Sequence, residues 1–164
     1  MMIDAFQPEG VTRIAVDSIF MMPHLGVLST VNEQAATEVF EKDCLIHLGT
    51  CVSLVKGSIG KPQGKCISYK IVLPDGKRIE ESLSYGELRA YPLGIEQTAE
   101  IEVLPTKNFD VGAGKGKPIT KKAFGGVVGI VIDARGKPIT FAKDKASRVE
   151  QLQRWTKAID AYPE

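Results

Sequence analysis

The stretch FDVGAGKGKPITKKAFGGVVGIVIDARGKP, residues 109–138, carries the strongest structural signal in this chain. Its first part repeats glycine at Gly112, Gly114 and Gly116, which permits backbone turns that residues with a Cβ resist. Its second part, residues 125–132, holds only glycine, valine and isoleucine, which is typical of a strand buried on both faces. A cationic glycine loop that leads into a buried strand fits either a binding site or a tightly turned β domain.

The composition is that of an ordinary globular chain. Its 164 residues, 43% hydrophobic and 25% charged, suit one domain or a small domain with an appendage. The net charge of the chain is +1, which does not favour binding to nucleic acid or to an anionic membrane. No apolar run approaches the ~20 residues of a membrane span, and the first residues lack the pattern of a signal peptide. Three sparse cysteines, Cys44, Cys51 and Cys66, favour a reducing cytoplasm.

The first 42 residues predict a short α/β segment. We expect a strand over residues 11–17 and an apolar helix over residues 19–28. Asn32 is a suitable N-cap for a second helix over residues 33–42. One strand and two helices cannot enclose a core, so this segment, residues 1–42, is expected to dock on something else.

The remaining residues, 43–164, predict a β domain that ends in a helix. The expected strands cover residues 45–48, 52–55, 67–73, 78–83, 88–92, 99–104, 127–132 and 139–141, with turns at 49–50, 74–77 and 135–136. Many short strands punctuated by Gly and Pro favour a small closed or nearly closed β-barrel. A helix over residues 144–161, capped by Asp144, carries an apolar stripe of Val149, Leu152, Trp155, Ile159 and Tyr162. The expected fold class is therefore mainly β (α+β).

No catalytic constellation is visible in the sequence. There is no GxSxG motif, and neither histidine lies near both an acid and a serine, so we expect no catalytic residue and no enzyme activity. A metal site built from Cys44, His47 and Cys51 has suitable spacing, but in a strand Cys44 and His47 face opposite sides. Buried thiols are the favoured interpretation, and neither a metal nor a cofactor is expected.

One ligand site remains as an alternative to a purely structural role. Its candidate residues are Asp110, Gly112, Gly114, Lys115, Gly116, Asp133 and Arg135. A phosphate loop needs GxxxxGK[ST] followed by a helix, whereas Pro118 and β-type residues follow Lys117 here. Solvated lysines and an Asp–Arg pair that fixes a turn are the favoured interpretations of these residues.

Several segments together resemble a known family. The segments are residues 7–12, Asp17 with 25–26, residues 48–50, 109–114 and 125–138, in this order. They are similar to the C-terminal third of the MutL proteins of the glutamate mutase (methylaspartate mutase) operon, which are distinct from the mismatch-repair proteins of that name. The resemblance runs along nearly the whole chain.

This resemblance implies an accessory or reactivating role for an adenosylcobalamin-dependent mutase. Members of the family have an actin/Hsp70-like ATPase core, whose phosphate motifs lie upstream of the region matched here. No ATPase residue can therefore be carried over to this chain. The resemblance also implies that residues 1–42 are the last elements of the ATPase fold and residues 43–164 an appended β domain. We expect a non-catalytic accessory or assembly domain, and the alternative is a small-molecule or nucleotide-binding β domain that uses residues 110–117.

An α/β segment without its parent sheet exposes apolar side chains, each worth ~1.5–3 kcal/mol when buried. The expected interface residues are Ile14, Val16, Phe20, Met21, Leu25 and Leu28. The expected partner is a second copy of the chain, or a separately encoded ATPase or mutase subunit; nucleic acid and membrane are not expected partners.

Overall fold

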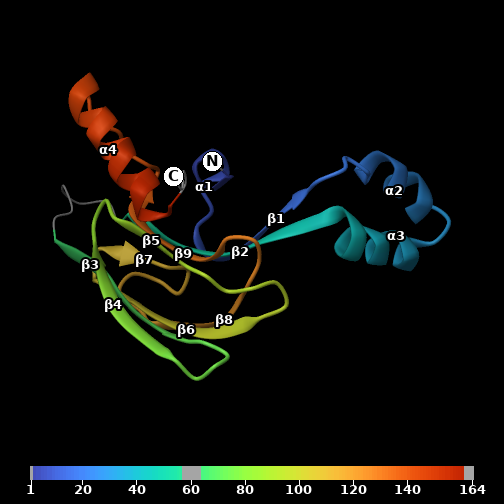
Figure 1. Ribbon diagram of the computed structural model, residues 1–164, viewed down its shortest axis with the longest axis horizontal. Helices are drawn as coiled ribbons and strands as arrows, with labels where there is room; N and C mark the ends of the chain where they lie inside the picture. The colour runs from blue at the N-terminus through green and yellow to red at the C-terminus, as the bar shows by residue number, and fades with distance from the viewer. Residues whose placement is uncertain (1, 57–63, 161–164) are drawn as a thin grey trace.

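The computed structural model describes residues 2–56 and 64–160 and has a mainly β, mixed α+β architecture (Figure 1). Its helical elements are α1 (Met2–Phe6), α2 (Met22–Ser29), α3 (Glu33–Val39), the π-helical turn η1 (Phe40–Cys44) and α4 (Lys145–Ala158). Its strands are β1 (Gly10–Asp17), β2 (Leu45–Lys56), β3 (Lys65–Val72), β4 (Arg78–Ser84), β5 (Leu88–Tyr91), β6 (Thr98–Pro105), β7 (Phe109–Asp110), β8 (Ile119–Phe124) and β9 (Gly129–Lys137).

The strands pair into two sheets. The first sheet has the order β1-β2-β9-β5, with β7 added beside β2, and the second has the order β4-β3-β6-β8. Figure 1 shows the two sheets as facing layers, and their alternating inward side chains form one core. That core includes Val52, Leu54, Ile130 and Ile132 from the first sheet and Ile67, Ile71, Ile101 and Val103 from the second. Among the described strands the sheets do not join into a closed barrel, so the expected small barrel is not confirmed.

Side chains connect the two sheets where backbone pairing does not. Near the β5 edge, the hydroxyl oxygens of Tyr69 and Tyr91 lie 2.6 Å apart and share a hydrogen bond. On β2, the Thr50 hydroxyl donates to the Phe124 carbonyl at 2.9 Å and accepts from the Phe124 amide at 2.8 Å. Thr50 is buried, so both bonds are shielded from water. These side-chain hydrogen bonds therefore hold the two sheets together at two places.

Strands β2 and β9 run parallel, and Gly49 lets their backbones come together, while Gly129 lets β9 approach β5. Gly49 pairs with Gly129 in the register of the two strands. A Cβ added to Gly49, whose φ is +133°, would overlap the Gly129 carbonyl oxygen. A Cβ added to Gly129, whose φ is +94°, would overlap the Tyr91 carbonyl oxygen. The glycines of this region are thus required by close backbone approach.

Three local predictions from the sequence are wrong. Residues 49–50 do not form a turn, because they lie within the single long strand β2. The pairing of β2 with β1 shifts register between His47 and Gly49. Residues 135–136 do not turn either, since β9 continues through Lys137 with Gly136 at a φ of +77°. Residues 139–141 form no strand, and a strand that the prediction did not include, β8, covers residues 119–124.

Helices α1 and α4 cover the outer face of the first sheet. Trp155 packs there against Leu88 and Val131, and its indole nitrogen donates to the Gly86 carbonyl oxygen at 2.7 Å. Asp144 caps α4 as predicted, because its side chain accepts from the Ser147 amide. In the predicted apolar stripe, Val149 and Leu152 are partly exposed, Ile159 packs on this cluster, and Tyr162 lies outside the described residues.

Residues 18–44 form a helical arm that stands away from both sheets (Figure 1). The predicted cap at Asn32 is confirmed, since its side chain accepts from the Ala35 amide at 3.0 Å. The strand before the arm, β1, pairs antiparallel with β2, and β2 begins directly after the arm. The expected boundary at residue 43 stays a prediction, but residues 10–17 are part of the first sheet.

The close approach of β2 and β9 predicts a large effect for Gly49→Ala. The added methyl group has no space beside Gly129, so we expect the free energy of unfolding to fall by ~2 kcal/mol or more. Gly26→Ala in α2 is the matched control, because nothing lies within 4 Å of its added Cβ. Urea unfolding followed by Trp155 fluorescence measures both. Equal stability of the two variants would contradict this account of the strand pair.

Candidate functional site

The glycine and lysine loop between β7 and β8 is organised by its own aspartate. The Asp110 carboxylate accepts hydrogen bonds from the amides of Gly112 at 2.7 Å and Gly114 at 2.9 Å. The Gly116 amide donates to the Phe109 carbonyl oxygen. Backbone donors that an anion would need are therefore already occupied within the loop. Lys115 and Lys117 point into solvent and remain exposed.

Asp133 lies at the centre of a buried charged network on β9. Its two oxygens accept from Arg135 Nε at 2.9 Å and Nη2 at 2.8 Å, and from Lys137 Nζ at 2.7 Å. The Arg135 backbone amide also donates to Asp133 at 3.0 Å, but the pair lies within β9 and does not fix a turn as expected. Asp133 has no exposed surface, and the other two side chains are almost fully covered.

The network also holds the terminal helices on the sheet. The Arg135 guanidinium contacts the Asp4 carboxylate of α1 at 2.7 Å and lies 4.8 Å from the centre of the Trp155 ring of α4. Both contacts use the planar guanidinium, which can pair with a carboxylate and stack on an aromatic ring together. Arg135 therefore joins three elements that lie far apart in the sequence.

Charge pairing sets the ionisation of this network. Burial alone raises the pKa of Asp133, but the hydrogen bonds and charges of Arg135 and Lys137 outweigh burial and bring that pKa below its usual value. Burial likewise lowers the pKa of Arg135, whereas Asp133 and Asp4 raise it, with a net rise. Asp133 and Arg135 are thus held in their charged forms at neutral pH.

The structure does not gather the predicted ligand residues into one site. Within the described residues, no hydrogen bond or ion pair joins the loop at 110–116 to Asp133 or Arg135. Sequence reasoning also missed Asp4 and Lys137 as members of the network. Asp133, Arg135 and Lys137 alternate along one strand, so a period-two pattern extended past residue 132 would have found Lys137. Asp4 has no such signal.

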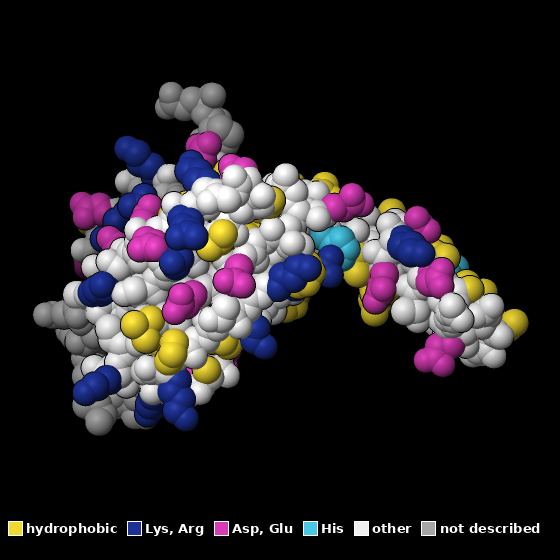
Figure 2. Space-filling view, turned by 90° about the horizontal axis from the view of Figure 1, so that it is seen from below, with side chains coloured by type: hydrophobic (Ala, Val, Ile, Leu, Met, Phe, Trp, Pro, Cys, Tyr) yellow, Lys and Arg dark blue, Asp and Glu magenta, His cyan; other side chains and the backbone are white. Residues whose placement is uncertain are grey.

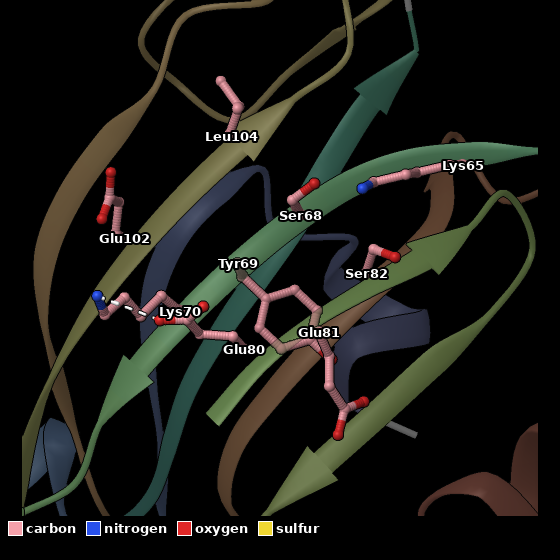
Figure 3. Close-up of a pocket in the computed structure, with 9 residues that line it drawn as sticks. All are labelled: Lys65, Ser68, Tyr69, Lys70, Glu80, Glu81, Ser82, Glu102 and Leu104. Atoms are coloured by element: carbon pink, nitrogen blue, oxygen red, sulfur yellow. Dashed lines mark ion pairs between the residues drawn. The ribbon is translucent and has the colours of Figure 1, made fainter. Parts of the chain in front are cut away.

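A shallow hollow of about 500 Å³ lies on the outer face of the second sheet. Figure 3 shows its side chains, which come from β3, β4 and β6: Lys65, Ser68, Tyr69, Lys70, Glu80, Glu81, Ser82, Glu102 and Leu104. Lys70 pairs with Glu80 at 3.2 Å, and both side chains are well exposed. The hollow mixes both signs of charge and is open to water, which is typical of the solvated face of an antiparallel sheet.

The cysteines are placed as inert core residues. Cys44, Cys51 and Cys66 are free and buried, as predicted from the sequence. Burial raises the pKa of Cys51 to about 11 and the pKa of Cys66 to about 12, so neither is a thiolate at neutral pH. Within residues 2–56 and 64–160, no group of three or more His, Cys, Asp or Glu side chains could hold a metal ion.

The arm, residues 18–44, carries the largest set of exposed apolar side chains on one projection. Phe20 is 83% exposed and Val31 85% exposed. Others on the arm are Ile19, Met22, Val27 and Leu28. Figure 2 shows hydrophobic and acidic side chains along the arm, whereas basic side chains are spread over the body. Isolated exposed apolar residues are normal, but a gathered set marks an interaction surface.

The six residues expected at an interface have different surroundings. Phe20 and Leu28 are exposed, and Ile14, Val16 and Met21 are half-buried. Leu25 is buried in the arm, where it helps to hold α2 against α3. Sequence reasoning missed Val27, because it did not separate the covered side of helix α2 from its open side, and it missed Val31, which lies in the turn between α2 and α3.

Phe20 is held in an unusual backbone conformation. Its φ is +54°, a left-handed value that a bulky side chain rarely adopts. The Asp17 carboxylate fixes it by accepting from the amides of Ile19 at 3.1 Å and Phe20 at 2.9 Å. The effect of this turn is to present an exposed aromatic ring at the base of the arm.

No protein-family model matches the chain, and no curated protein or solved structure is significantly similar to it. In the part of the chain that the structure describes, no helix has the length and apolar character needed to cross a membrane.

Replacing Asp133 with Asn leaves two buried cations without their anion. We expect Asp133→Asn to lower the free energy of unfolding at neutral pH by about 3–5 kcal/mol. Folding lowers the pKa of Asp133. Its contribution to the free energy of unfolding is therefore present above the unfolded-state pKa and is lost as pH falls through the folded-state pKa. The difference in the free energy of unfolding between the variant and the wild type should therefore become smaller at acidic pH.

Urea unfolding at a series of pH values measures this difference. Glu80→Gln is the control, since it breaks an exposed ion pair and should change stability by about 0–1 kcal/mol. If Asp133→Asn changed stability as little as Glu80→Gln, the buried network would not hold the terminal helices as described.

Proposed function

We propose that this chain is a non-catalytic accessory or assembly domain that works by docking its arm on another protein. On this view the two sheets act as a barrel-like scaffold, and residues 18–44 form the contact element. The resemblance to the C-terminal part of the MutL proteins supports a place beside an ATPase or a cobalamin-dependent mutase. The three free thiols suit a reducing cytoplasm.

Phe20 is the observation that carries this function. A left-handed backbone conformation costs about 1–3 kcal/mol and persists where the surroundings impose it, often at functional positions. Here the Asp17 carboxylate imposes it, and the result is a large aromatic ring that is 83% exposed. Exposed aromatic residues are typical anchors of protein interfaces. A structural role alone gives no reason to hold an apolar ring in water.

Removing this ring should abolish partner binding without unfolding the domain. We expect Phe20→Ser to weaken binding of a co-encoded ATPase or mutase subunit at least ~10-fold, which is the loss expected for an interface anchor. Isothermal titration with the purified subunit measures the affinity. Phe6→Ser is the matched control, because Phe6 is 74% exposed but lies on α1, away from the arm. Equal loss in both variants, or none in Phe20→Ser, would contradict the docking role.

A small-molecule or nucleotide-binding β domain is the second candidate, supported by the exposed Lys115 and Lys117 in the glycine loop. Internal use of the Gly112 and Gly114 amides by Asp110 disfavours it. We therefore expect phosphate, nucleotides and cobalamin fragments to leave the melting temperature unchanged in a thermal-shift assay. A concentration-dependent rise that Lys115→Ala removes would favour the ligand-binding role instead.

A further inference from the structure

Charge is divided unevenly between the arm and the rest of the chain. Residues 18–44 hold four carboxylates, Glu33, Glu38, Glu41 and Asp43, and one lysine, Lys42, which gives a net charge of −3. Since the whole chain carries +1, the remainder carries +4. Lys42 already pairs with Glu38 at 3.4 Å, so the other three carboxylates set the charge of the arm surface.

The positive charge is concentrated in the segment 106–122. This lysine segment contains five lysines, Lys107, Lys115, Lys117, Lys121 and Lys122, and one acid, Asp110, for a net charge of +4. All five lysines are exposed, and none of them pairs with a carboxylate in the described part of the chain. Asp110 is turned inward to the loop amides. Lys122 has Glu100 opposite in the strand register, so the lysines of the loop dominate the surface charge.

The lysine segment lies at the opposite end of β2 from the arm. The arm joins β2 at Leu45, whereas β7, where the segment runs beside the sheet, pairs with β2 at Val55. Ten residues of strand at ~3.3 Å each separate these points by roughly 33 Å. Figure 1 likewise places β7 on the far side of the sheets from the arm. The arm therefore does not reach the β7 end of the lysine segment in the same chain.

We infer that the arm of one copy docks on the lysine segment of a second copy, so that the protein associates head to tail. This inference rests on the proposed docking role of the arm and names its occupant. Two arms facing each other would oppose charges of the same sign, whereas an arm against the lysine segment pairs −3 with +4. Leu104, 49% exposed, and Pro118 adjoin the lysines and offer apolar surface for the side chains of the arm.

Head-to-tail contacts differ from symmetric ones in a testable way. Each copy uses two different surfaces, so assembly continues into a ring or a chain. A variant that loses one surface keeps the other intact. Two complementary variants should therefore pair with each other although neither associates with itself.

Sedimentation velocity of the full chain tests this geometry. The arm variant is Glu33→Lys with Glu41→Lys, and the segment variant is Lys115→Glu with Lys117→Glu. We expect the wild type to form assemblies that grow with concentration and dissociate at high salt. Each variant alone should remain a monomer, and an equimolar mixture should give a species of twice the monomer mass.

The control variant is Lys143→Glu with Lys145→Glu. It changes the net charge by the same amount as the segment variant, but outside the lysine segment, and should associate like the wild type. A monomeric wild type, variants that associate unchanged, or a mixture that stays monomeric would each overturn the head-to-tail inference. If the wild type is monomeric but Phe20→Ser still weakens binding of the partner subunit, the proposed function stands without it. If Phe20→Ser changes neither self-association nor binding of the partner subunit, the proposed docking role of the arm is contradicted as well.

Discussion

The close backbone approach of β2 and β9 is the constraint on which the body depends. Parallel strands cannot be joined by a tight turn, and here residues 57–128 form the connection between them. That connection contains the whole second sheet, so the core between the sheets exists only if this pair forms. Gly49 makes the pair possible, because any side chain there would occupy the space of the Gly129 carbonyl group, and Gly129 in turn leaves room for the Tyr91 carbonyl group of β5.

The pair also explains why a charged network can lie inside the molecule. On one face of β9, Ile130 and Ile132 enter the core between the sheets. On the other face, Asp133 and Arg135 lie beneath the two terminal helices. Buried ions are costly unless every partner is present, so the network forms only when α1 and α4 are in place. It thereby acts together with the small apolar cluster around Trp155 to place α1 and α4 on the sheet.

Local features could be predicted from the sequence, and long-range pairing could not. The caps at Asn32 and Asp144 depend on side chains within three residues, and both predictions are confirmed. The role of Gly49 depends on Gly129, eighty positions away, and the sequence around Gly49 reads equally well as a turn. The candidate ligand residues illustrate the same limit. Asp110 and Asp133 both bind neighbouring groups as local patterns suggest, but only the strand arrangement reveals that they serve separate structures.

Strand β2 also determines how the body would bear a mechanical load. A pull on the arm enters at Leu45 and acts along the strand axis, while the bonds to β1 and β9 run across it. Such a ladder is loaded in shear, so its bonds share the force and must break together. The β3–β4 hairpin, with its free turn at residues 73–77, would instead open one bond at a time. The arm is therefore attached to a strand that neighbouring strands hold on both sides.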